Sequence, residues 1–475
     1  MREEALVASP LNPVLSVGVL SDVELLFVDT VQGKPVWRTL LVPLNSLEGP
    51  EGLLAFLWET GLERFWVMPA SRFSQSSAWF EAARNRWSIL SRAGVDKPGR
   101  AARILFLPKD NGPRQTRQLV LLFPEYAGWD WKLSNMHSLL ATVSYLEQVL
   151  ERPLADASEQ VARQLLSDLT RDGPLAAFRA SAGNAGTLCD REGNPIPLWE
   201  YMRDMAWMRP LNRGEQRGRY LHKYTHLSLS LQAALRVLLG GGAAQHSVNG
   251  RAYDGARPGI WRVHAEAAGS VFNGKQLPGM LLEQPWRSTP QVACCQEIGY
   301  HTQISEGWYW QESYPLLQTW AARLWQAAER LHTNSQRYRH VEARNNAFSA
   351  ITRLAQLGID LIGQTREAGG WGRPDWWAQL VGGGQAQFFR QLVQLVRKGI
   401  MPVLVVGNAF WLVSDEANPT AAAPLLFSSR RWSGYMVGYQ TPLPLSNVVK
   451  EAFQKAEQAG ELGKRLDALA SGDNN

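Results

Sequence analysis

Cysteine is scarce in this sequence, which has three among 475 residues: Cys189, Cys294 and Cys295. Three thiols are too few for a disulfide framework, and their spacing does not match the Cys-x-x-Cys pattern of zinc sites. The sequence also has no run of about 18 uncharged apolar residues that would predict a membrane span. Its opening residues, MREEALVASP, lack the basic start and apolar core of a signal peptide. We therefore expect a soluble, cytoplasmic protein.

Signatures of common catalytic sites are also missing. The eight histidines are scattered without a His-Glu-x-x-His pattern; His222 and His226, four residues apart, would share one face of a helix, but we favour structural roles for both. The glycine runs 240–242 and 382–384 lack the Lys-Ser/Thr of a phosphate loop and predict turns. No Gly-x-Ser-x-Gly elbow is present. We expect Cys294 and Cys295 to be a buried structural pair rather than reactive thiols.

The composition that remains is that of a large globular protein. With 45% hydrophobic and 19% charged residues, the chain has room for two or three domains. Lys and Arg outnumber Asp and Glu by 49 to 43, and the basic residues gather in three stretches, 81–120, 203–223 and 323–344. Several of the 20 tryptophans stand beside arginine. Any one of them fits a core position, but together they indicate surfaces for nucleic acid.

Apolar periodicity predicts an α/β opening followed by a more helical second half. We expect strands at 14–19, 23–30, 38–44, 64–69, 102–108 and 117–124, the last two forming a hairpin, and helices at 47–61, 136–150 and 158–169. A Gly- and Asn-rich stretch at 181–197 marks a linker. Beyond it we expect a strand at 259–267, a strand-turn-strand unit at 401–416, and helices at 315–331, 342–357, 385–398 and 445–469.

Two segments of the second half resemble family-B-like DNA polymerases of bacterial mobile elements. The stretch YLHKYTHLSLSL, residues 220–231, resembles the first palm motif, in which a strand carries a metal-binding Asp; this chain has Thr225 there. The run VVGNAFWLVSD, residues 405–415, resembles the later palm hairpin, whose turn carries the second Asp; this chain has Asn408 there. Arg373-Pro-Asp-Trp-Trp and the helix after it stand where the family places its nucleotide-binding fingers helix.

The resemblance implies an α/β and α+β multidomain fold. An RNase H-like exonuclease-type domain would occupy residues 1–155, with Asp29 near the expected first-strand carboxylate but Val31 where a second acid would stand. The remaining segments would be a linker at 156–200, the first part of a palm-like domain at 201–310, a helical fingers-like insertion at 311–400, and the palm-like hairpin with a C-terminal helix at 401–475.

The residues at Thr225 and Asn408 bear on whether the protein is an active polymerase or binds nucleic acid without catalysis. Two-metal phosphoryl transfer needs carboxylates that hold Mg²⁺ ions about 3.5–4 Å apart, and neutral Thr and Asn bind Mg²⁺ weakly. We therefore expect a degenerate, inactive polymerase-like protein, without a cofactor, that binds nucleic acid as a subunit of a mobile-element, replication or defence complex. One alternative is a nucleic-acid-binding subunit of an RNA-guided, CRISPR-type effector, and another is an interaction scaffold whose basic patches are solvated faces.

A further alternative is an active, Mg²⁺-dependent polymerase or nuclease with displaced carboxylates, for which Asp415 and Asp360 are the candidates, followed by Glu416 and Asp375. The expected partners are nucleic acid, DNA before RNA, and other protein subunits, with no membrane. The residues predicted to contact phosphates are Arg84, Arg86, Arg100, Arg103, Arg114, Arg117, Arg209, Arg213, Arg217, Arg219, Lys223, Arg337, Arg339, Arg373 and Arg390. Those predicted to stack on bases are Trp87, Trp207, Trp376 and Trp377.

Overall fold

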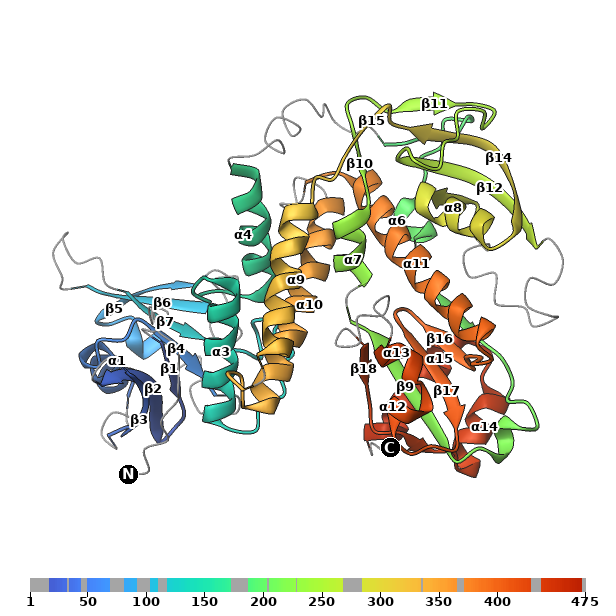
Figure 1. Cartoon of the computed structure of the whole chain (residues 1–475). Helices are drawn as coiled ribbons and strands as arrows, with labels where there is room; N and C mark the ends of the chain where they lie inside the picture. Colours follow the sequence, from blue (N-terminus) through green and yellow to red (C-terminus); the bar gives the residue numbers. More distant parts are fainter. Residues whose placement is uncertain are drawn as a thin grey trace. The chain divides into compact units, whose positions relative to one another are not determined.

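The chain has a mixed α/β fold that divides into two compact units (Figure 1). The computed structural model describes residues 17–31, 34–43, 49–68, 81–91, 103–109, 118–171, 187–202, 205–227, 229–267, 284–334, 336–364, 371–428 and 437–471. Unit 1 comprises Met1–Ser167 and Arg323–Gly358, and unit 2 comprises Asp168–Ala322 and Ile359–Asn475. The sequence places a boundary within 156–200, but it does not predict that residues 323–358 group with the N-terminal segment.

Unit 1 is built on a seven-stranded mixed sheet in the order β3-β2-β1-β4-β7-β6-β5. The strands are β1 (Val17–Leu20), β2 (Glu24–Val31), β3 (Lys34–Leu41), β4 (Arg64–Val67), β5 (Trp87–Ser91), β6 (Arg103–Pro108) and β7 (Leu119–Leu122). β1 is antiparallel to β2 but parallel to β4, and β4 is parallel to β7. The predicted strands and the β6–β7 hairpin are confirmed. The strand β5 was not predicted.

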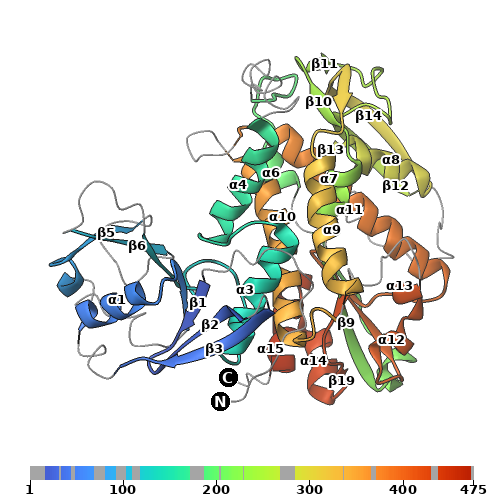
Figure 2. The ribbon, with the colours of Figure 1, turned by 60° about the vertical axis from the view of Figure 1, so that its left-hand side comes forward.

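Helices cover both faces of this sheet (Figures 1 and 2). Helix α1 (Pro50–Glu59) packs Leu53, Leu54 and Leu57 into a core with Phe65 and Leu121. Helix α3 (Met136–Leu150) contacts β1 and β2, and its Glu147 forms a buried ion pair with Arg64 of β4. Because alternate residues of a strand face opposite sides, each central strand contributes to both cores.

Parts of three further helices belong to unit 1. Most of α9 (Gln318–Thr333) and α10 (Val341–Gly363) belongs to this unit, together with α4 (Ser158–Arg171). The rings of Tyr145 and Tyr338 meet edge to face, with centroids 4.9 Å apart. The Ser138 hydroxyl donates to Glu342 over 2.6 Å. These contacts join residues about two hundred positions apart into one unit.

Unit 2 contains an antiparallel sheet in the order β18-β9-β17-β16-β8, in which β19 also pairs with β9. The strands are β8 (Ala206–Met208), β9 (Tyr220–His226), β16 (Leu404–Val406), β17 (Ala409–Ser414), β18 (Val437–Tyr439) and β19 (Leu443–Pro444). The predicted strand-turn-strand unit is confirmed: β16 and β17 form a hairpin with Gly407 and Asn408 at its tip. Gly407 has a φ of +58°, which the tight turn requires of its first central residue.

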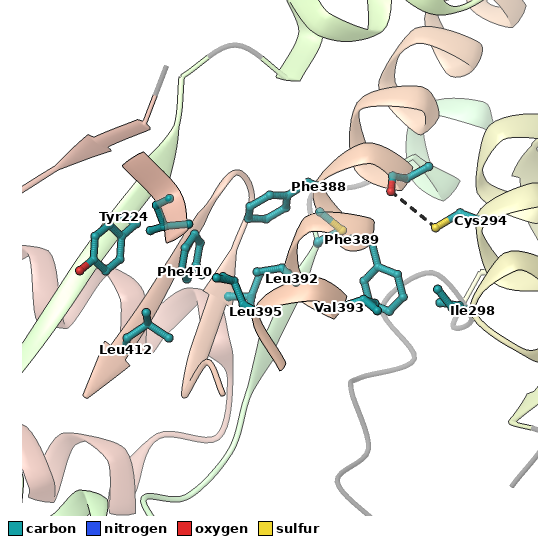
Figure 3. Packing of buried hydrophobic residues seen from close by; sticks show 14 of the residues in the cluster. Tyr224, Cys294, Ile298, Phe388, Phe389, Leu392, Val393, Leu395, Phe410 and Leu412 are labelled. Atoms are coloured by element: carbon teal, nitrogen blue, oxygen red, sulfur yellow. Dashed lines mark hydrogen bonds between the residues drawn. The ribbon is translucent and has the colours of Figure 1, made fainter. Parts of the chain in front are cut away.

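The two faces of this sheet are buried by different helices. On one face, Tyr224, Phe410 and Leu412 share a buried cluster with Phe388 and Leu392 of α11 (Pro374–Arg397), which Figure 3 shows. On the other face, side chains including Trp411 pack against the last helices, α14 (Asn447–Lys455) and α15 (Ala459–Ser471). A single helix at 445–469 was predicted, but the chain leaves the helical path between α14 and α15.

A second sheet, in the order β11-β14-β12-β13, lies between β9 and α9 in the sequence. Its strands are β11 (Gln245–Ser247), β12 (Gly259–Ala267), β13 (Trp286–Ser288) and β14 (Tyr300–Tyr309), and helix α8 (Thr289–Glu297) packs against it. The strand at 259–267 was predicted; the sheet was not. Cys294 and Cys295 of α8 are buried and free, as expected, and burial raises the pKa of Cys294 to about 12 and that of Cys295 to about 11.

The glycine runs correct the sequence prediction of turns at every position but Gly242, which lies in a bend with a φ of +71°. Gly382, Gly383 and Gly384 lie inside α11, which begins at Pro374 rather than at 385. A Cβ on Gly382 would lie 2.0 Å from Oγ of Ser288, and one on Gly383 would lie 2.5 Å from Val237, so the run permits close packing. In the other run, Gly240 belongs to β10 (Leu239–Gly241), where a Cβ would lie 2.2 Å from the ring of Trp310.

Candidate functional site

The two palm-like motifs meet where β9 ends beside the tip of the β16–β17 hairpin. We call this place the strand-hairpin junction and define it by Thr225, His226, Asn408, Ala409 and Gly438. The sheet brings these residues together from three strands and one turn, although they are up to 213 positions apart (from Thr225 to Gly438). Thr225 and Asn408, identified from the sequence alone, both belong to it.

The residues flanking Thr225 have no carboxylate. In the register of the sheet, Thr225 pairs with Ala409 on β17 and with Gly438 on β18. Directly paired residues project to the same face, with Cβ atoms about 4.5–5.5 Å apart. A pair of carboxylates at the Thr225 and Ala409 positions would therefore be close enough to share a cation. In this chain the row reads Gly, Thr, Ala, which has one hydroxyl and no charge.

Asn408 has a different role from the one suggested by the motif. Its backbone carbonyl accepts a 2.8 Å hydrogen bond from the amide of His226, and its side-chain nitrogen donates to the His226 carbonyl over 2.8 Å. Asn408 therefore closes the end of β9 and stands opposite His226, one position from the Thr225 row. The residue paired with Thr225 is Ala409, which the sequence analysis did not single out. Strict alternation along the hairpin was the signal that could have found it.

His222 and His226 lie on a strand, not on the helix for which their spacing was considered. Both are fully buried, and Nε2 of His222 donates to the Glu416 carbonyl over 2.8 Å. The side-chain nitrogen of Gln391 on α11 lies 3.5 Å from Nε2 of His226. Burial lowers the pKa of His226 to about 3 and lowers the pKa of His222 as well, because a charged imidazole loses its hydration there. Both histidines are therefore neutral parts of the core.

The candidates for a relocated metal site do not lie together at the junction. Asp415 is exposed at the far end of β17, about 20 Å along the strand from Ala409 at ~3.3 Å per residue. Asp360 is on α10, where it accepts a hydrogen bond from the Trp377 indole over 3.4 Å. Asp375 is buried in an ion pair with Arg373. In the described part of the chain, no group of three or more His, Cys, Asp or Glu side chains is arranged to hold a metal ion.

The acidic residue expected on the first strand of unit 1 is on the second instead. Asp29 belongs to β2, and its carboxylate forms an ion pair with Arg38 of β3, 3.0 Å away. The first strand, β1, has the sequence VGVL. The position of Asp29 therefore corrects the alignment suggested by the sequence.

Several predicted phosphate-binding residues are engaged in ion pairs. Arg209 donates to both carboxylate oxygens of Glu215, over 2.5 and 2.7 Å. Lys223 contacts Asp467 at 2.6 Å and lies 5.1 Å from the ring centroid of Trp411. The other ion pairs are Arg84–Glu81, Arg86–Glu51, Arg103–Asp156 and Arg390–Glu297. Exposed pairs such as Arg84–Glu81 are weak, so their arginines remain available to other anions.

Arg373 and the predicted stacking residues occupy interior positions. Arg373 is 4% exposed, pairs with Asp375 at 2.6 Å and lies 3.8 Å from the ring centroid of Trp376. The tryptophans at 87, 376 and 377 are buried as well, and Trp207 is half-buried against the core that contains Tyr224. For Arg373, Trp87, Trp376 and Trp377 these positions correct the expectation of a side chain that faces a nucleic acid, because the folded core already covers them. The role of Trp207 stays a prediction. Among the described aromatics, Trp199 and Tyr439 are exposed; neither was predicted.

Eight of the predicted phosphate-binding arginines remain to be placed, and five of them are in the described part of the chain. Arg100, Arg114 and Arg117 lie outside the described residues. Arg339 is exposed and donates to the Gln336 carbonyl, while Arg337 is half-buried and lies 5.9 Å from the ring centroid of Tyr338. Arg213, Arg217 and Arg219 are all exposed, and within the described part of the chain their side chains have no ion-pair or hydrogen-bond partner. The roles of these residues remain predictions.

Comparisons with known proteins give distant likenesses among solved structures. No protein-family model matches the sequence, and no curated protein matches it significantly. Among solved structures, Phi29 DNA polymerase complexed with single-stranded DNA matches with a TM-score of 0.38 and 10% identity, over 83% of this chain and 80% of that one. Phi29 DNA polymerase complexed with primer-template DNA matches with a TM-score of 0.39 and 11% identity, over 82% and 79% of the two chains. A likeness of this size does not assign a function. No described helix is both long and apolar enough to cross a membrane.

Proposed function

We propose that this protein binds nucleic acid through a polymerase-like fold whose palm junction does not perform phosphoryl transfer. The observation that carries the proposal is the register at the junction, where Thr225 pairs with Ala409 and Gly438. Mg²⁺ is held by converging oxygen ligands, chiefly carboxylates and waters. A single hydroxyl between two side chains without oxygen does not supply that set.

The topology of the strands supports the polymerase-like part of the proposal. The strand with the first motif, β9, pairs directly with β17 of the second motif, so one sheet contains both motifs. In unit 1, the antiparallel strands β3, β2 and β1 continue into the parallel strands β4 and β7, an arrangement compatible with the proposed RNase H-like domain. The proposal extends to a role as a subunit of a mobile-element, replication or defence complex, in which a partner supplies catalysis.

Equilibrium binding without divalent metal tests the binding half of this function. Fluorescence anisotropy of a labelled primed template, with EDTA present, should show binding that weakens steeply between about 50 and about 200 mM KCl. A phosphate backbone gives this response because bound cations release condensed counterions, whereas a scaffold with solvated basic faces would leave the anisotropy unchanged. Absence of binding at the lowest salt concentration would reject the proposal.

A further inference from the structure

The segment Leu211–Arg219, which we call the arginine loop, presents three exposed arginines whose side chains have no ion-pair partner among the described residues. Arg213, Arg217 and Arg219 lie within seven residues of one another and are all exposed. The acidic residue of the loop, Glu215, does not neutralise them, because both of its carboxylate oxygens accept from Arg209. The exposed cations of this loop therefore keep their charge available to an external anion.

Hydrogen bonds fix the shape of the loop. The amide of Asn212 donates to Glu215 over 2.9 Å, and the amide of Glu215 donates back to the Asn212 side chain over 2.9 Å. The amide of Gln216 donates to the Asn212 carbonyl over 2.9 Å. Arg209 ties this turn to the carbonyl of Pro402 over 3.0 Å. Because these hydrogen bonds already order the backbone, less entropy is lost when the loop binds a ligand. They also fix the spacing of the arginine Cα atoms, which favours a ligand with regularly placed charges.

The loop is also seated against the sheet. A Cβ on Gly218 would lie 2.4 Å from Val413 of β17, so the backbone lies directly on that strand. The carbonyl of Arg219 accepts a 2.8 Å hydrogen bond from the amide of Leu445. The arginine loop therefore has a fixed place at the start of β9, about 20 Å from Thr225 at ~3.3 Å per residue.

We infer that the arginine loop is a binding surface for the phosphate backbone of a nucleic acid, separate from the strand-hairpin junction. This inference rests on the proposed function and names one surface that performs it. A guanidinium group binds phosphate oxygens through two parallel hydrogen bonds. Three such groups in one segment suit a ligand with several phosphates, such as a nucleic-acid backbone, better than a single small anion. Leu211, the one apolar side chain of the segment, is buried, so the loop offers no apolar side chain to anchor a peptide or enter a lipid bilayer.

Two acidic residues nearby limit the strength of this surface. Ser414 pairs with Tyr220, so Asp415 and Glu416 follow β17 close to the start of β9, and both are exposed. Neither forms an ion pair with the three arginines. Their carboxylates lower the local positive potential. Neutralising Asp415 and Glu416 should therefore strengthen the binding of a nucleic acid.

Charge variants of the full-length protein test the surface. We expect R213Q/R217Q/R219Q to weaken binding of a labelled duplex and of the matching single strand about tenfold or more, and to reduce the slope of log affinity against log salt by about three. The matched control R236Q/R251Q/R397Q removes three exposed arginines of unit 2 outside the loop and should change the slope much less. D415N/E416Q should tighten binding.

The outcomes separate this inference from the proposed function. If the wild-type protein binds and R213Q/R217Q/R219Q gives the same slope of log affinity against log salt, the inference about the arginine loop is overturned and the proposed function is retained. No binding by the wild-type protein would overturn both. An equal reduction of this slope in the loop variant and in the control variant would show a general charge effect. It would reject the arginine loop as a specific binding surface. Competition by polyglutamate or anionic vesicles as effective as that by unlabelled nucleic acid would reject a nucleic-acid surface.

Discussion

His226 is fully buried where β9 meets the hairpin turn, and its environment keeps it neutral. Its ring lies near Gln391 and has a ring contact with Phe388, whose centroid is 6.4 Å away. No carboxylate faces it from α11 or from the hairpin tip that would stabilise its charged form. The depressed pKa, about 3, therefore reflects desolvation rather than a charged neighbour.

This burial predicts loss of stability in acid. A histidine with an ordinary pKa near ~6.5 in the unfolded chain takes up a proton there before it does in the folded protein. Its contribution to stability is therefore fully present above about pH 6.5 and is lost as the pH falls toward about 3, by up to ~1.4 kcal/mol per pH unit. Urea unfolding of unit 2, followed between neutral and mildly acidic pH, measures this slope.

The variant H226Q provides the control for the acid effect. It is expected to lower stability at neutral pH and to reduce the pH dependence by close to one proton. His222 contributes in the same direction, because burial also lowers its pKa, so part of the slope will remain. An unchanged slope in H226Q would show that His226 is not the group responsible.

At the residue scale, the sequence predicts chemical identity better than orientation. That Thr225 and Asn408 are neutral can be read directly from the motifs, and the structure places both at one junction. The pairing of Thr225 with Ala409 depends on the register, because a shift of one residue moves every side chain to the other face of the sheet. Whether a tryptophan is a stacking surface or a core residue depends on contacts such as that of Trp377 with Trp199, 3.8 Å between centroids, which no local pattern specifies.

At the scale of single elements, α11 shows how packing overrides propensity. Glycine costs up to ~1 kcal/mol relative to alanine inside a helix, so three in succession predict a break. The helix nevertheless continues because Gly382 approaches Ser288, the N-cap residue of α8, and Gly383 approaches Val237. Where the period is strong and no contact interferes, prediction succeeds: α3 spans Met136–Leu150 and β12 spans Gly259–Ala267, both as expected.

The glycine packing predicts opposite effects for two alanine substitutions. Gly382→Ala should destabilise unit 2 by about 1–3 kcal/mol, because the new methyl group displaces Ser288 from the capping box it forms with Gln291. Gly460→Ala in α15 should stabilise by about 0.4–1 kcal/mol, since no heavy atom lies within 4 Å of its Cβ position. Thermal unfolding of both variants measures the two effects. A gain of stability in Gly382→Ala would contradict the close approach of α11 to α8.

At the scale of the whole molecule, the sequence indicates a multidomain α/β protein but not how its segments combine. The predicted linker overlaps the boundary at Ser167 and Asp168. Residues 323–358 return to unit 1 through contacts such as Tyr145 with Tyr338 and Ser138 with Glu342, which connect distant parts of the chain. Composition and hydrophobic periodicity carry no information about such long-range pairings. The sequence therefore predicts residues 311–400 as one continuous insertion.

The central claim is that this fold binds nucleic acid without extending it. Primer extension by the purified full-length protein, with Mg²⁺ or Mn²⁺ and all four nucleotides, beside an anisotropy measurement on the same primed template, tests this most directly. We expect salt-sensitive binding and no extension, because Thr225, Ala409 and Gly438 offer no carboxylate at the junction. Extension that is abolished by Asp415→Ala or Asp360→Ala would contradict the claim and establish an enzyme with a displaced metal site.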